Sequence, residues 1–442
     1  MRITPYGAAQ TVTGSCHLVE RSGYKLLLDC GAYQGSEDHR NAEPFGFEPG
    51  EVDAVVISHA HHDHIGRLPI LIRRGYRGKV HLSEPTRRFL PVILEDALRL
   101  MTEERKSRKA PHLLWDQADL DELYQRLEPV PLHQDLALGP FTVRLQGAGH
   151  LPGSAFIEVR EGERRLIFSG DLGNRSKEVL PDPENPAPAD LVLCEGTYGD
   201  RPHRPFDQTI AEFAQILSEH LGQGGKVFVP SFALERTQEV LYYLRELEQQ
   251  NKIPSVPVYV DSPMADRISE IYPQVKRYFS PEVQALYERG IDPFSPRYLR
   301  HTHTVEDSKA LGDRFGPLVI VAGNGMLSGG RILHHLRQGL PDPKNALVIT
   351  GYQPRGGLGR VLLEGAQQVR MFGEDVRVRA QTYTLGGFSG HAGQDELLDW
   401  LKGENRVALV HGEPDKLQTL ARALGSRGQR ATVAEWGEPI EV

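Results

Sequence analysis

The chain has 442 residues, of which 25% are charged and 39% hydrophobic, and its formal net charge is −8. This is the composition of an ordinary globular protein, and the length indicates two domains. The acidic net charge argues against a strong nucleic-acid binder, although a locally positive site can still hold a polyanion.

The cysteines and the N-terminus bear on the compartment. Cys16, Cys30 and Cys194 lie far apart and form no CxxC motif, which favours a reducing compartment over a disulfide framework. No signal peptide is visible, and no apolar run is long enough to span a membrane. We therefore expect a cytoplasmic protein.

The N-terminal third alternates short apolar runs with polar clusters. We predict strands over residues 25–30, 54–57, 79–82, 141–145, 166–169 and 190–194, and a helical segment over 85–130. An acidic or imidazole side chain lies at or after several of these runs, namely Asp29, His59, His150, Asp171 and Glu195. Because functional loops follow strand ends in layered α/β proteins, these side chains are expected to share one rim.

Helix and strand alternate beyond the segment Pro202-His203-Arg204-Pro205, which we take as a domain boundary. We predict helices over 207–221, 234–250 and 330–338, and strands over 226–230, 256–260, 317–322 and 346–350. This βαβ pattern implies a separate parallel sheet. A strand over 376–383, a helix over 395–401 and a strand over 406–410 follow, while the glycine-rich pieces 323–330 and 351–359 are expected to be loops.

The segment His59-Ala60-His61-His62-Asp63-His64 places four imidazoles and one carboxylate in one short turn. Each neutral imidazole offers one lone pair to a metal, and a carboxylate can bind one metal or bridge two, so this density of ligands implies more than one metal ion. The alternative is a solvated histidine-rich loop. We disfavour it because an apolar run over 52–58 precedes the segment and a turn into a helix at Gly66 follows it.

Two later segments add ligands of the same kind. Gly149-His150-Leu151-Pro152-Gly153-Ser154 supplies an imidazole in a glycine-flanked turn, and Ser169-Gly170-Asp171-Leu172-Gly173 supplies a carboxylate after a strand. A lone histidine or aspartate of this kind is usually structural. Their combination with the histidine-rich segment favours a metal site instead.

Taken together, these motifs resemble the metallo-β-lactamase superfamily, an α/β fold built as a four-layer αββα sandwich. The resemblance implies two zinc ions, the first held by His59, His61 and His150, the second by Asp63 and His64, with Asp171 bridging them. It also implies that Asp29 orients the ligand loop and that His62 is not a ligand. Redox members with two irons have a pattern similar to HxExD at this loop, whereas this chain has His61. The imidazole therefore favours zinc and hydrolysis, with Mn²⁺ as an alternative activating metal.

Further segments resemble the β-CASP nucleases, in the order of that family: Cys194–Arg201, Pro230–Glu239, Gly323–Gly330, Phe388–Ala392 and Val410–Glu413. The resemblance implies a metallo-β-lactamase domain in two parts, residues 1–200 and 368–442. It also implies an inserted α/β domain with a parallel sheet, residues 201–367, that closes over the site. The active site would then lie in an interdomain cleft, which favours single-stranded RNA over a duplex.

The resemblance assigns roles to three distant residues. His411 completes the second zinc site, and His391, hydrogen-bonded to Glu195, is the general acid that acts beside the ligand Asp63. A histidine at the position of His411 marks RNA-processing members, whereas DNA-repair members carry valine.

The prediction is a zinc-dependent ribonuclease for single-stranded RNA, with the endonucleolytic and 5′-to-3′ exonucleolytic modes left open. The chain ends soon after His411, which favours the short type, similar to the endonuclease subunit of the cleavage and polyadenylation machinery.

Candidate RNA contacts lie on two glycine-containing loops that lead into helices. Helix N-termini bind phosphate through free backbone N–H groups, without sequence preference. The candidates are Ser389, Asn324, Ser328, Arg236 and Arg331, together with Lys226. For Ser389, plain helix capping is an equally good interpretation, and arginines on helices are often ordinary surface charges.

Two other classes of function remain open at this point. A zinc hydrolase of a small molecule, such as a glyoxalase-type thioesterase, would account for the residues up to Asp171 but not for His391 or His411. A non-catalytic RNA-binding scaffold would be expected to have lost ligands, and here every ligand position is filled. A homodimer is compatible with the sequence but is not indicated by it.

Overall fold

A computed structural model of the chain describes residues 1–106, 113–353 and 356–442. The chain divides into two compact units. The first contains Met1–Arg175, Leu180–Pro202 and His391–Val442, and the second contains Ser176–Val179 and His203–Gly390. The chain therefore returns to the first unit at His391 rather than at residue 368, because the strands between these positions belong to the second unit.

The first unit contains two seven-stranded mixed sheets within the described residues. One has the order β22 (Ile440–Glu441), β1 (Arg2–Pro5), β2 (His17–Arg21), β3 (Tyr24–Leu28), β4 (Ala54–Val56), β5 (Lys79–Leu82) and β6 (Leu127–Pro129). The other has the order β21 (Arg430–Val433), β20 (Arg406–Val410), β11 (Leu191–Glu195), β10 (Arg164–Phe168), β9 (Ala155–Glu161), β8 (Phe141–Gly147) and β7 (Asp135–Leu138). Strands β3, β4 and β5 run parallel in the first sheet, as do β10, β11 and β20 in the second.

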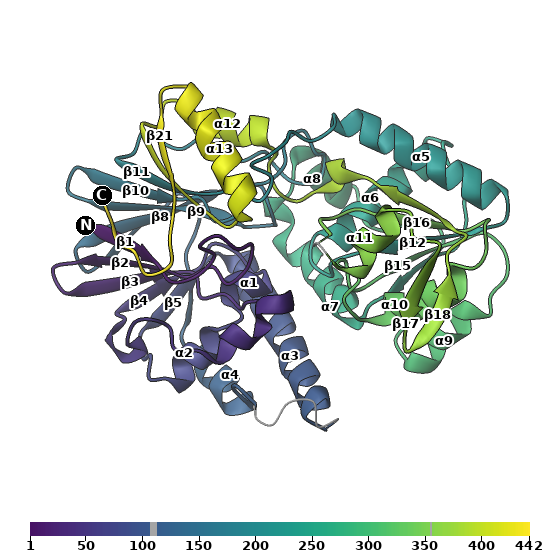
Figure 1. Ribbon diagram of the computed structural model, residues 1–442, viewed down its shortest axis with the longest axis horizontal. Helices are drawn as coiled ribbons and strands as arrows, with labels where there is room; N and C mark the ends of the chain where they lie inside the picture. The colour runs from purple at the N-terminus through teal and green to yellow at the C-terminus, as the bar shows by residue number, and fades with distance from the viewer. Residues whose placement is uncertain (107–112, 354–355) are drawn as a thin grey trace. The chain divides into compact units, whose positions relative to one another are not determined.

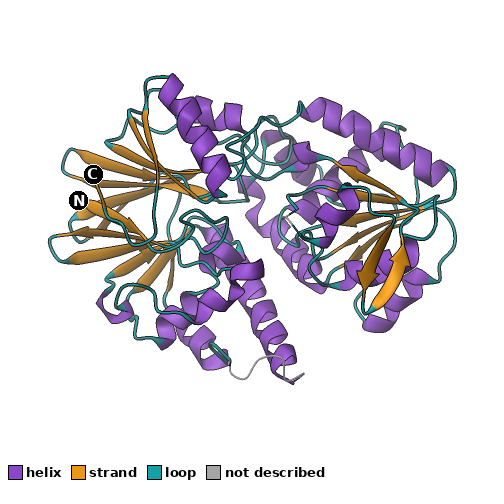
Figure 2. Cartoon of the chain, in the orientation of Figure 1, coloured by secondary structure: helices purple, strands orange, loops and turns teal. Residues whose placement is uncertain are grey.

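Helices cover the outer faces of these two sheets (Figures 1 and 2). The first sheet is covered by α2 (Leu68–Arg73), α3 (Glu84–Lys106) and α4 (Gln117–Tyr124), with the short α1 (His62–Ile65) at its edge, and the second by α12 (Gln394–Trp400) and α13 (Pro414–Ser426). Short 3-10 segments occur in this unit at Gly35–Ala42 and Pro49–Glu51, and in the second unit at Tyr272–Tyr278 and Gly386–Phe388. This layering confirms the predicted αββα sandwich.

The core of the first unit lies between the two sheets. In β8, Phe141, Val143 and Leu145 are buried while the residues between them are half-buried, which is the period-two pattern of a strand with one face on a core. Leu28 and Val56 of the first sheet belong to the same buried cluster. A rigid sandwich of this kind holds the loops at its edge in fixed positions.

The second unit contains a six-stranded sheet whose paired strands are all parallel. Its order is β14 (Leu299–His301), β13 (Val258–Asp261), β15 (Leu318–Ala322), β12 (Lys226–Pro230), β16 (Ala346–Ile349) and β19 (Gln381–Thr384). The helices are α5 (Phe206–Gly222), α6 (Arg236–Gln249), α7 (Pro263–Ile271), α8 (Pro281–Glu288), α9 (Val305–Gly312), α10 (Arg331–Gly339) and α11 (Leu358–Leu363). The parallel sheet predicted from the βαβ pattern is confirmed.

Three predicted elements differ from the structure. The segment 376–383 is not one strand, because β18 (Glu374–Arg377) forms an antiparallel hairpin with β17 (Gln368–Met371) and the chain then joins the six-stranded sheet as β19. Of the predicted helical segment 85–130, residues 107–112 lie outside the described part and residues 127–129 form β6. The predicted loop 351–359 includes 354–355, also outside the described part, and its last residues begin α11. Among the described residues, no helix has the length and apolar character needed to cross a membrane.

Candidate metal centre

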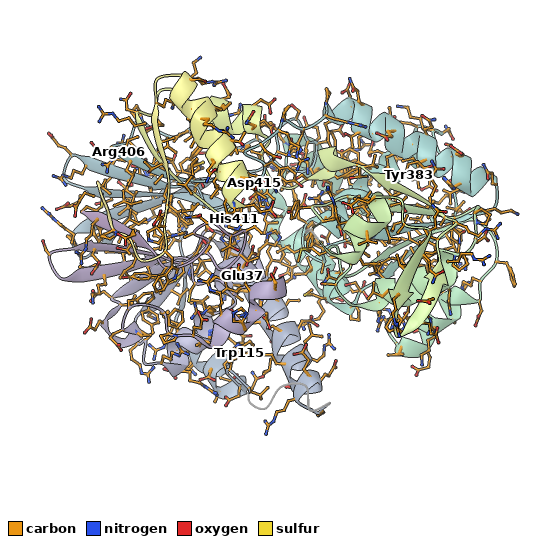
Figure 3. The ribbon with its side chains drawn as sticks, viewed as in Figure 1. Glu37, Trp115, Tyr383, Arg406, His411 and Asp415 are labelled. Atoms are coloured by element: carbon orange, nitrogen blue, oxygen red, sulfur yellow. The ribbon has the colours of Figure 1, made fainter. Side chains whose placement is uncertain are left out.

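Several strand ends of the first unit meet at one edge of the two facing sheets. The side chains at the ends of β3, β4, β10, β11 and β20, or within three residues after them, include Asp29, His59, Asp171, Glu195 and His411. The sheets are joined at this edge by a hydrogen bond of 2.9 Å from Ala155 N to the carbonyl of Ser58. Figure 3 labels Arg406, the first residue of β20, and His411, which directly follows the last residue of β20 and lies at this edge.

His59, His61 and His150 bring three ring nitrogens together. His61 Nδ1 lies 3.2 Å from His59 Nε2 and 3.0 Å from His150 Nε2. Asp171 Oδ2 lies 3.5 Å from His59 Nε2 and 3.6 Å from His150 Nε2. Nitrogen ligands of a tetrahedral metal ion, each about 2.0–2.1 Å from it, lie roughly 3.3 Å from one another. The four side chains therefore have the spacing of one tetrahedral metal site.

Asp63, His64 and His411 form a second group, whose ligand atoms lie within 4.8 Å of one another. His411 Nε2 lies 3.5 Å from Asp63 Oδ2. Asp171 also faces this group, since its Oδ2 lies 3.3 Å from His64 Nε2 and its Oδ1 lies 3.7 Å from His411 Nδ1. Asp171 is thus positioned between the two groups, as a bridging carboxylate would be.

Three buried polar atoms of this cluster make no hydrogen bond to the described residues: His64 Nε2, His411 Nε2 and Asp171 Oδ1. An unsatisfied buried polar atom costs about 1–3 kcal/mol of stability. Three such atoms in one cluster therefore indicate that a further group binds there. Imidazole nitrogens and carboxylate oxygens are metal ligands, and a divalent cation would satisfy all three atoms. The residues present therefore fit divalent metal ions.

Asp29 holds His64 from the side away from the other ligands. Its Oδ2 accepts hydrogen bonds from His64 Nδ1 at 2.7 Å, Ser58 Oγ at 2.9 Å and Ser15 Oγ at 3.0 Å, and its Oδ1 accepts from Ser58 N at 2.8 Å. The backbone of Asp29 has a φ of +59°, which few non-glycine residues adopt. Because Nδ1 of His64 is bound to this carboxylate, Nε2 is the nitrogen left to coordinate a metal.

Burial and charge set the protonation of these histidines. Loss of solvation lowers the pKa of His59 well below its usual value and that of His61 to about 3, so both rings are neutral at pH 7. Burial acts in the same direction on His64, but the carboxylates of Asp171 and Asp29 outweigh it and raise its pKa well above the usual value. A metal ion that binds His64 would therefore have to displace a proton.

His391 lies beside the ligands and is oriented by Glu195. Its Nδ1 lies 3.2 Å from both carboxylate oxygens of Glu195 and 3.9 Å from Asp171 Oδ2. Glu195 is fully buried and accepts a hydrogen bond of 2.7 Å from Leu172 N. Burial opposes charge on His391, but Glu195 and Asp171 raise its pKa to about 9. The side chain is 22% exposed, so a protonated imidazole is accessible beside the metal ligands.

His62, the remaining histidine of the segment, belongs to neither ligand group. Its Nδ1 lies 3.3 Å from Gln34 Nε2. The segment after β3 passes close to the histidine-rich segment and requires a glycine at position 31. A Cβ on Gly31 would lie 1.6 Å from the carbonyl oxygen of Asp63. Only glycine lets the end of β3 pass so near the ligand segment.

Three hydroxyl residues that sequence reasoning missed contact the candidate ligands. Ser58 Oγ lies 3.0 Å from His59 Nδ1, and Thr197 Oγ1 lies 3.1 Å from His411 Nδ1. Ser154 Oγ accepts a hydrogen bond of 3.0 Å from the backbone N–H of His150. The available signal was their proximity in sequence to a ligand or motif, since nothing in a serine or threonine itself indicates this role.

The candidate RNA contacts all lie in the second unit. Asn324 is half-buried and Ser328 is exposed, and Asn324 Nδ2 donates a hydrogen bond of 3.1 Å to Ser328 Oγ. Arg331 is 22% exposed and its Nη1 lies 2.6 Å from Asp261 Oδ1. Ser389 is only 3% exposed, which leaves it little surface for RNA.

Two of the basic candidates already have partners within the second unit. Arg236 is buried, and its guanidinium forms ion pairs with Glu235 at 3.2 Å and Glu239 at 3.5 Å. Its charge is already compensated within the fold, and little of its side chain is exposed for contact with RNA. Lys226 begins β12, at the opposite end of that strand from the glycine loop, and its Nζ donates to the carbonyls of Leu311 and Gly312.

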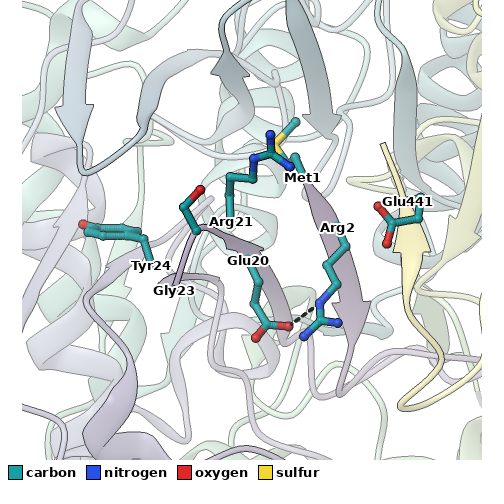
Figure 4. Close-up of a pocket in the computed structure, with 8 residues that line it drawn as sticks. Met1, Arg2, Glu20, Arg21, Gly23, Tyr24 and Glu441 are labelled. Atoms are coloured by element: carbon teal, nitrogen blue, oxygen red, sulfur yellow. Dashed lines mark hydrogen bonds and ion pairs between the residues drawn. The ribbon is translucent and has the colours of Figure 1, made fainter.

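A pocket of about 330 Å³ lies at the far end of β2 and β3 from the metal ligands (Figure 4). Its lining residues are Met1, Arg2, Glu20, Arg21, Ser22, Gly23, Tyr24 and Glu441. Both of its arginines are paired, since Arg2 Nε lies 2.9 Å from Glu20 Oε2 and Arg21 Nε lies 2.7 Å from Glu161 Oε1. We do not treat it as a catalytic site because none of the metal-ligand groups lies in it.

Three family models match the chain. The metallo-beta-lactamase superfamily matches residues 10–230, the Beta-Casp domain matches residues 237–362, and the Zn-dependent metallo-hydrolase RNA specificity domain matches residues 375–434. Together these matches include both ligand groups, His391 and Glu195.

Two curated proteins and one solved structure illustrate the similarity. Ribonuclease TTHA0252 of Thermus thermophilus is 53% identical over 442 residues, covering 100% of both chains. Transcription termination factor FttA of Methanocaldococcus jannaschii is 30% identical over 438 residues, covering 94% of this chain and 67% of that protein. A crystal structure of a protein of unknown function from Enterococcus faecalis V583 matches 100% of this chain and 99% of that one with a TM-score of 0.57 and 12% identity, which shows a shared fold alone.

Proposed function

The chain belongs to the β-CASP family of the metallo-β-lactamase superfamily, and on that premise we propose that it is a metal-dependent ribonuclease that hydrolyses phosphodiester bonds of single-stranded RNA. Two findings from the comparisons support an RNA substrate. The relative with 53% identity is named a ribonuclease, and the model matching residues 375–434 describes an RNA specificity domain.

One observation carries the proposal. The first ligand group contains Asp171, the second group faces it through His64 and His411, and His391 Nδ1 lies 3.9 Å from Asp171 Oδ2. A phosphodiesterase needs positive charge beside the phosphate oxygens, an attacking water and a proton for the leaving oxygen. The two ligand groups and the adjacent imidazole supply places for all three functions.

We propose two zinc ions as the resident metals, with Mn²⁺ as an alternative activator. The first would be held by His59, His61, His150 and Asp171, and the second by Asp63, His64, His411 and Asp171. Nitrogen-rich tetrahedral ligand sets favour zinc over magnesium or calcium. When bound, the two cations would supply an activated water and neutralise charge on the non-bridging phosphate oxygens.

His391 is proposed as the general acid. Its Nδ1 faces the Glu195 carboxylate, which fixes the tautomer and makes Nε2 the atom that donates to the substrate. The proton would go to the leaving 3′-oxygen of the RNA, giving a 3′-hydroxyl and a 5′-phosphate. Glu195 stabilises the imidazolium before the transfer and does not itself contact the substrate.

The two rival functions fit fewer of these observations. A small-molecule thioesterase would use the first ligand group and Asp171 but would leave the buried Glu195 and its contact with His391 without a role. A non-catalytic RNA-binding scaffold would not need a complete ligand set. We place the activity in the cytoplasm, which agrees with the three buried free cysteines.

The test is a direct comparison of substrates. Metal-loaded enzyme is incubated with 5′-labelled single-stranded RNA, with DNA of the same sequence and with a glutathione thioester, and products are resolved over time. Cleavage of RNA with little cleavage of DNA or thioester supports the proposal. A ladder of products indicates an endonuclease, and immediate release of mononucleotide indicates an exonuclease. Hydrolysis of the thioester with intact RNA would overturn the proposal in favour of the small-molecule hydrolase.

A further inference from the structure

Phe232 is an exposed aromatic residue at the carboxyl edge of the parallel sheet in the second unit. It follows β12 after a single intervening residue, and 40% of it is accessible to solvent. The carboxyl edge of a parallel sheet is where α/β domains commonly bind ligands. A single exposed phenylalanine needs no explanation by itself, so the surroundings of this ring decide its significance.

The backbone that carries Phe232 is firmly held. The carbonyl oxygen of Phe232 accepts two hydrogen bonds from Thr237, one from the backbone N–H at 3.1 Å and one from Oγ1 at 2.7 Å. The preceding residue, Ser231, donates its N–H to the carbonyl of Ala322 on the neighbouring strand. The ring is therefore presented from a fixed position, which reduces the entropy lost when a ligand stacks on it.

Glycine backbone flanks the ring. A Cβ on Gly325 would lie 3.0 Å from Cδ2 and Cε2 of Phe232, and a Cβ on Gly351 would lie 3.6 Å from Cε2. Gln353 Nε2 donates a hydrogen bond of 2.8 Å to the carbonyl of Gly325, which fixes this part of the loop. The ring thus lies against glycine backbone on one side, and 40% of the residue remains accessible to solvent.

The same glycine loop carries polar groups. Asn324 Oδ1 accepts a hydrogen bond of 2.7 Å from Met326 N, and the Nδ2 of Asn324 donates to the exposed Ser328. There is open space where a Cβ on Gly329 would be. The ring lies against Gly325 of a loop that also carries an amide and a hydroxyl group. This combination matches one nucleotide of a single strand, whose base stacks and whose phosphate and sugar accept hydrogen bonds.

We propose that Phe232 stacks on one base of a single-stranded RNA and that the loop Asn324–Gly330 borders the same nucleotide. The inference rests on the proposed ribonuclease function and assigns a specific contact to it. It makes the second unit a binding unit that recognises the unpaired base itself. A duplex, whose bases are already stacked, would not gain this contact.

The experiment measures RNA binding by the full chain carrying His391→Ala, so that the RNA is cleaved slowly. Fluorescence anisotropy is recorded with a labelled oligouridine and with the same oligomer made abasic at successive single positions. Phe232→Ala, Phe232→Leu and Phe232→Tyr are compared in this background. Phe315→Ala serves as the matched control, since Phe315 is fully exposed in the same unit.

Loss of one base–aromatic stack weakens binding by about 5- to 150-fold, which corresponds to roughly 1–3 kcal/mol. We expect that loss for Phe232→Ala and Phe232→Leu, with Phe232→Tyr and Phe315→Ala within about twofold of the parent. One abasic position should cause the same loss in the parent and no further loss in Phe232→Ala. Equal binding by Phe232→Ala and the parent, or an additive effect at every abasic position, would overturn the inference.

This outcome is separable from failure of the proposed function. If the metal-loaded wild-type chain cleaves no RNA, the ribonuclease proposal fails whatever the variants show. If it cleaves RNA and Phe232→Ala does so with an unchanged KM, only the stacking inference fails. Supporting kinetics would show KM raised by the same factor as the dissociation constant, with kcat changed by less than about threefold.

Discussion

His391 Nδ1 lies 3.2 Å from each carboxylate oxygen of Glu195, a contact that joins residues 196 positions apart in the chain. Glu195 ends β11 in the sandwich, and His391 is the first residue after the chain returns from the second unit. Two segments on either side of the second unit therefore supply the members of this pair. His391 Nδ1 also lies 3.9 Å from Asp171 Oδ2, beside the candidate metal ligands.

Replacement of His391 by alanine should slow the chemical step while leaving the metals in place. One general acid contributes about 10²–10⁴-fold, so we expect single-turnover cleavage of RNA to fall by that factor. The metal content, measured by mass spectrometry, should equal that of the wild type. A variant that loses metal, or one that keeps the full rate, would contradict the role assigned to His391.

Glu195→Gln should shift the pH profile of cleavage. Burial disfavours the imidazolium, but the Glu195 carboxylate is the largest of the influences that raise the pKa of His391, which reaches about 9. Removal of that negative charge lowers the pKa, so the protonated acid is lost at a lower pH. The descending alkaline limb of the rate should therefore begin at lower pH in Glu195→Gln than in the wild type. An unchanged limb would mean that another group governs it.

Two histidines of the same short segment provide a matched pair. His59→Ala removes a ligand of the first group, so we expect the loss of about one equivalent of metal and of nearly all cleavage. His62→Ala removes an imidazole that belongs to neither group. It should retain both metals and cleave within about threefold of the wild-type rate. Metal loss of the same size in both variants would refute the ligand assignment.

Asp29→Asn tests the residue behind His64. The amide cannot hold the His64 ring as the carboxylate does, and loss of such a supporting contact typically costs 10- to 100-fold in metal affinity or activity. We expect weaker metal binding in a chelator competition, together with recovery of cleavage at high metal concentration. Recovery is the discriminating result, because an irreversible folding defect would not respond to added metal.

Much of the fold and of the site followed from local signals in the sequence. The apolar runs before Asp29 and His59 predicted buried strands, and alternation of helix and strand predicted the parallel sheet of the second unit. The ligand types and their spacing in the histidine-rich segment predicted a metal site, and the structure brings His150, Asp171 and His411 to it.

Other features depend on tertiary contacts that leave no local pattern. Arg236 sits on a helix like any surface arginine, and only the fold shows that Glu235 and Glu239 compensate its charge. The division of residues 376–383 between a hairpin and the main sheet depends on pairing with distant strands. The exposure of Phe232 likewise reflects the glycine loop beside it rather than its own neighbours in sequence.

The most direct test of the central claim is metal titration of RNA cleavage. Metal-free enzyme is reconstituted with measured equivalents of Zn²⁺, or of Mn²⁺ in a parallel series, and the initial rate on labelled single-stranded RNA is recorded at each point. The two ligand groups on either side of Asp171 predict that the rate rises until two equivalents are bound and that the products carry 5′-phosphates. RNA that remains intact at two equivalents of either metal, or a rate that does not depend on metal, would contradict the account.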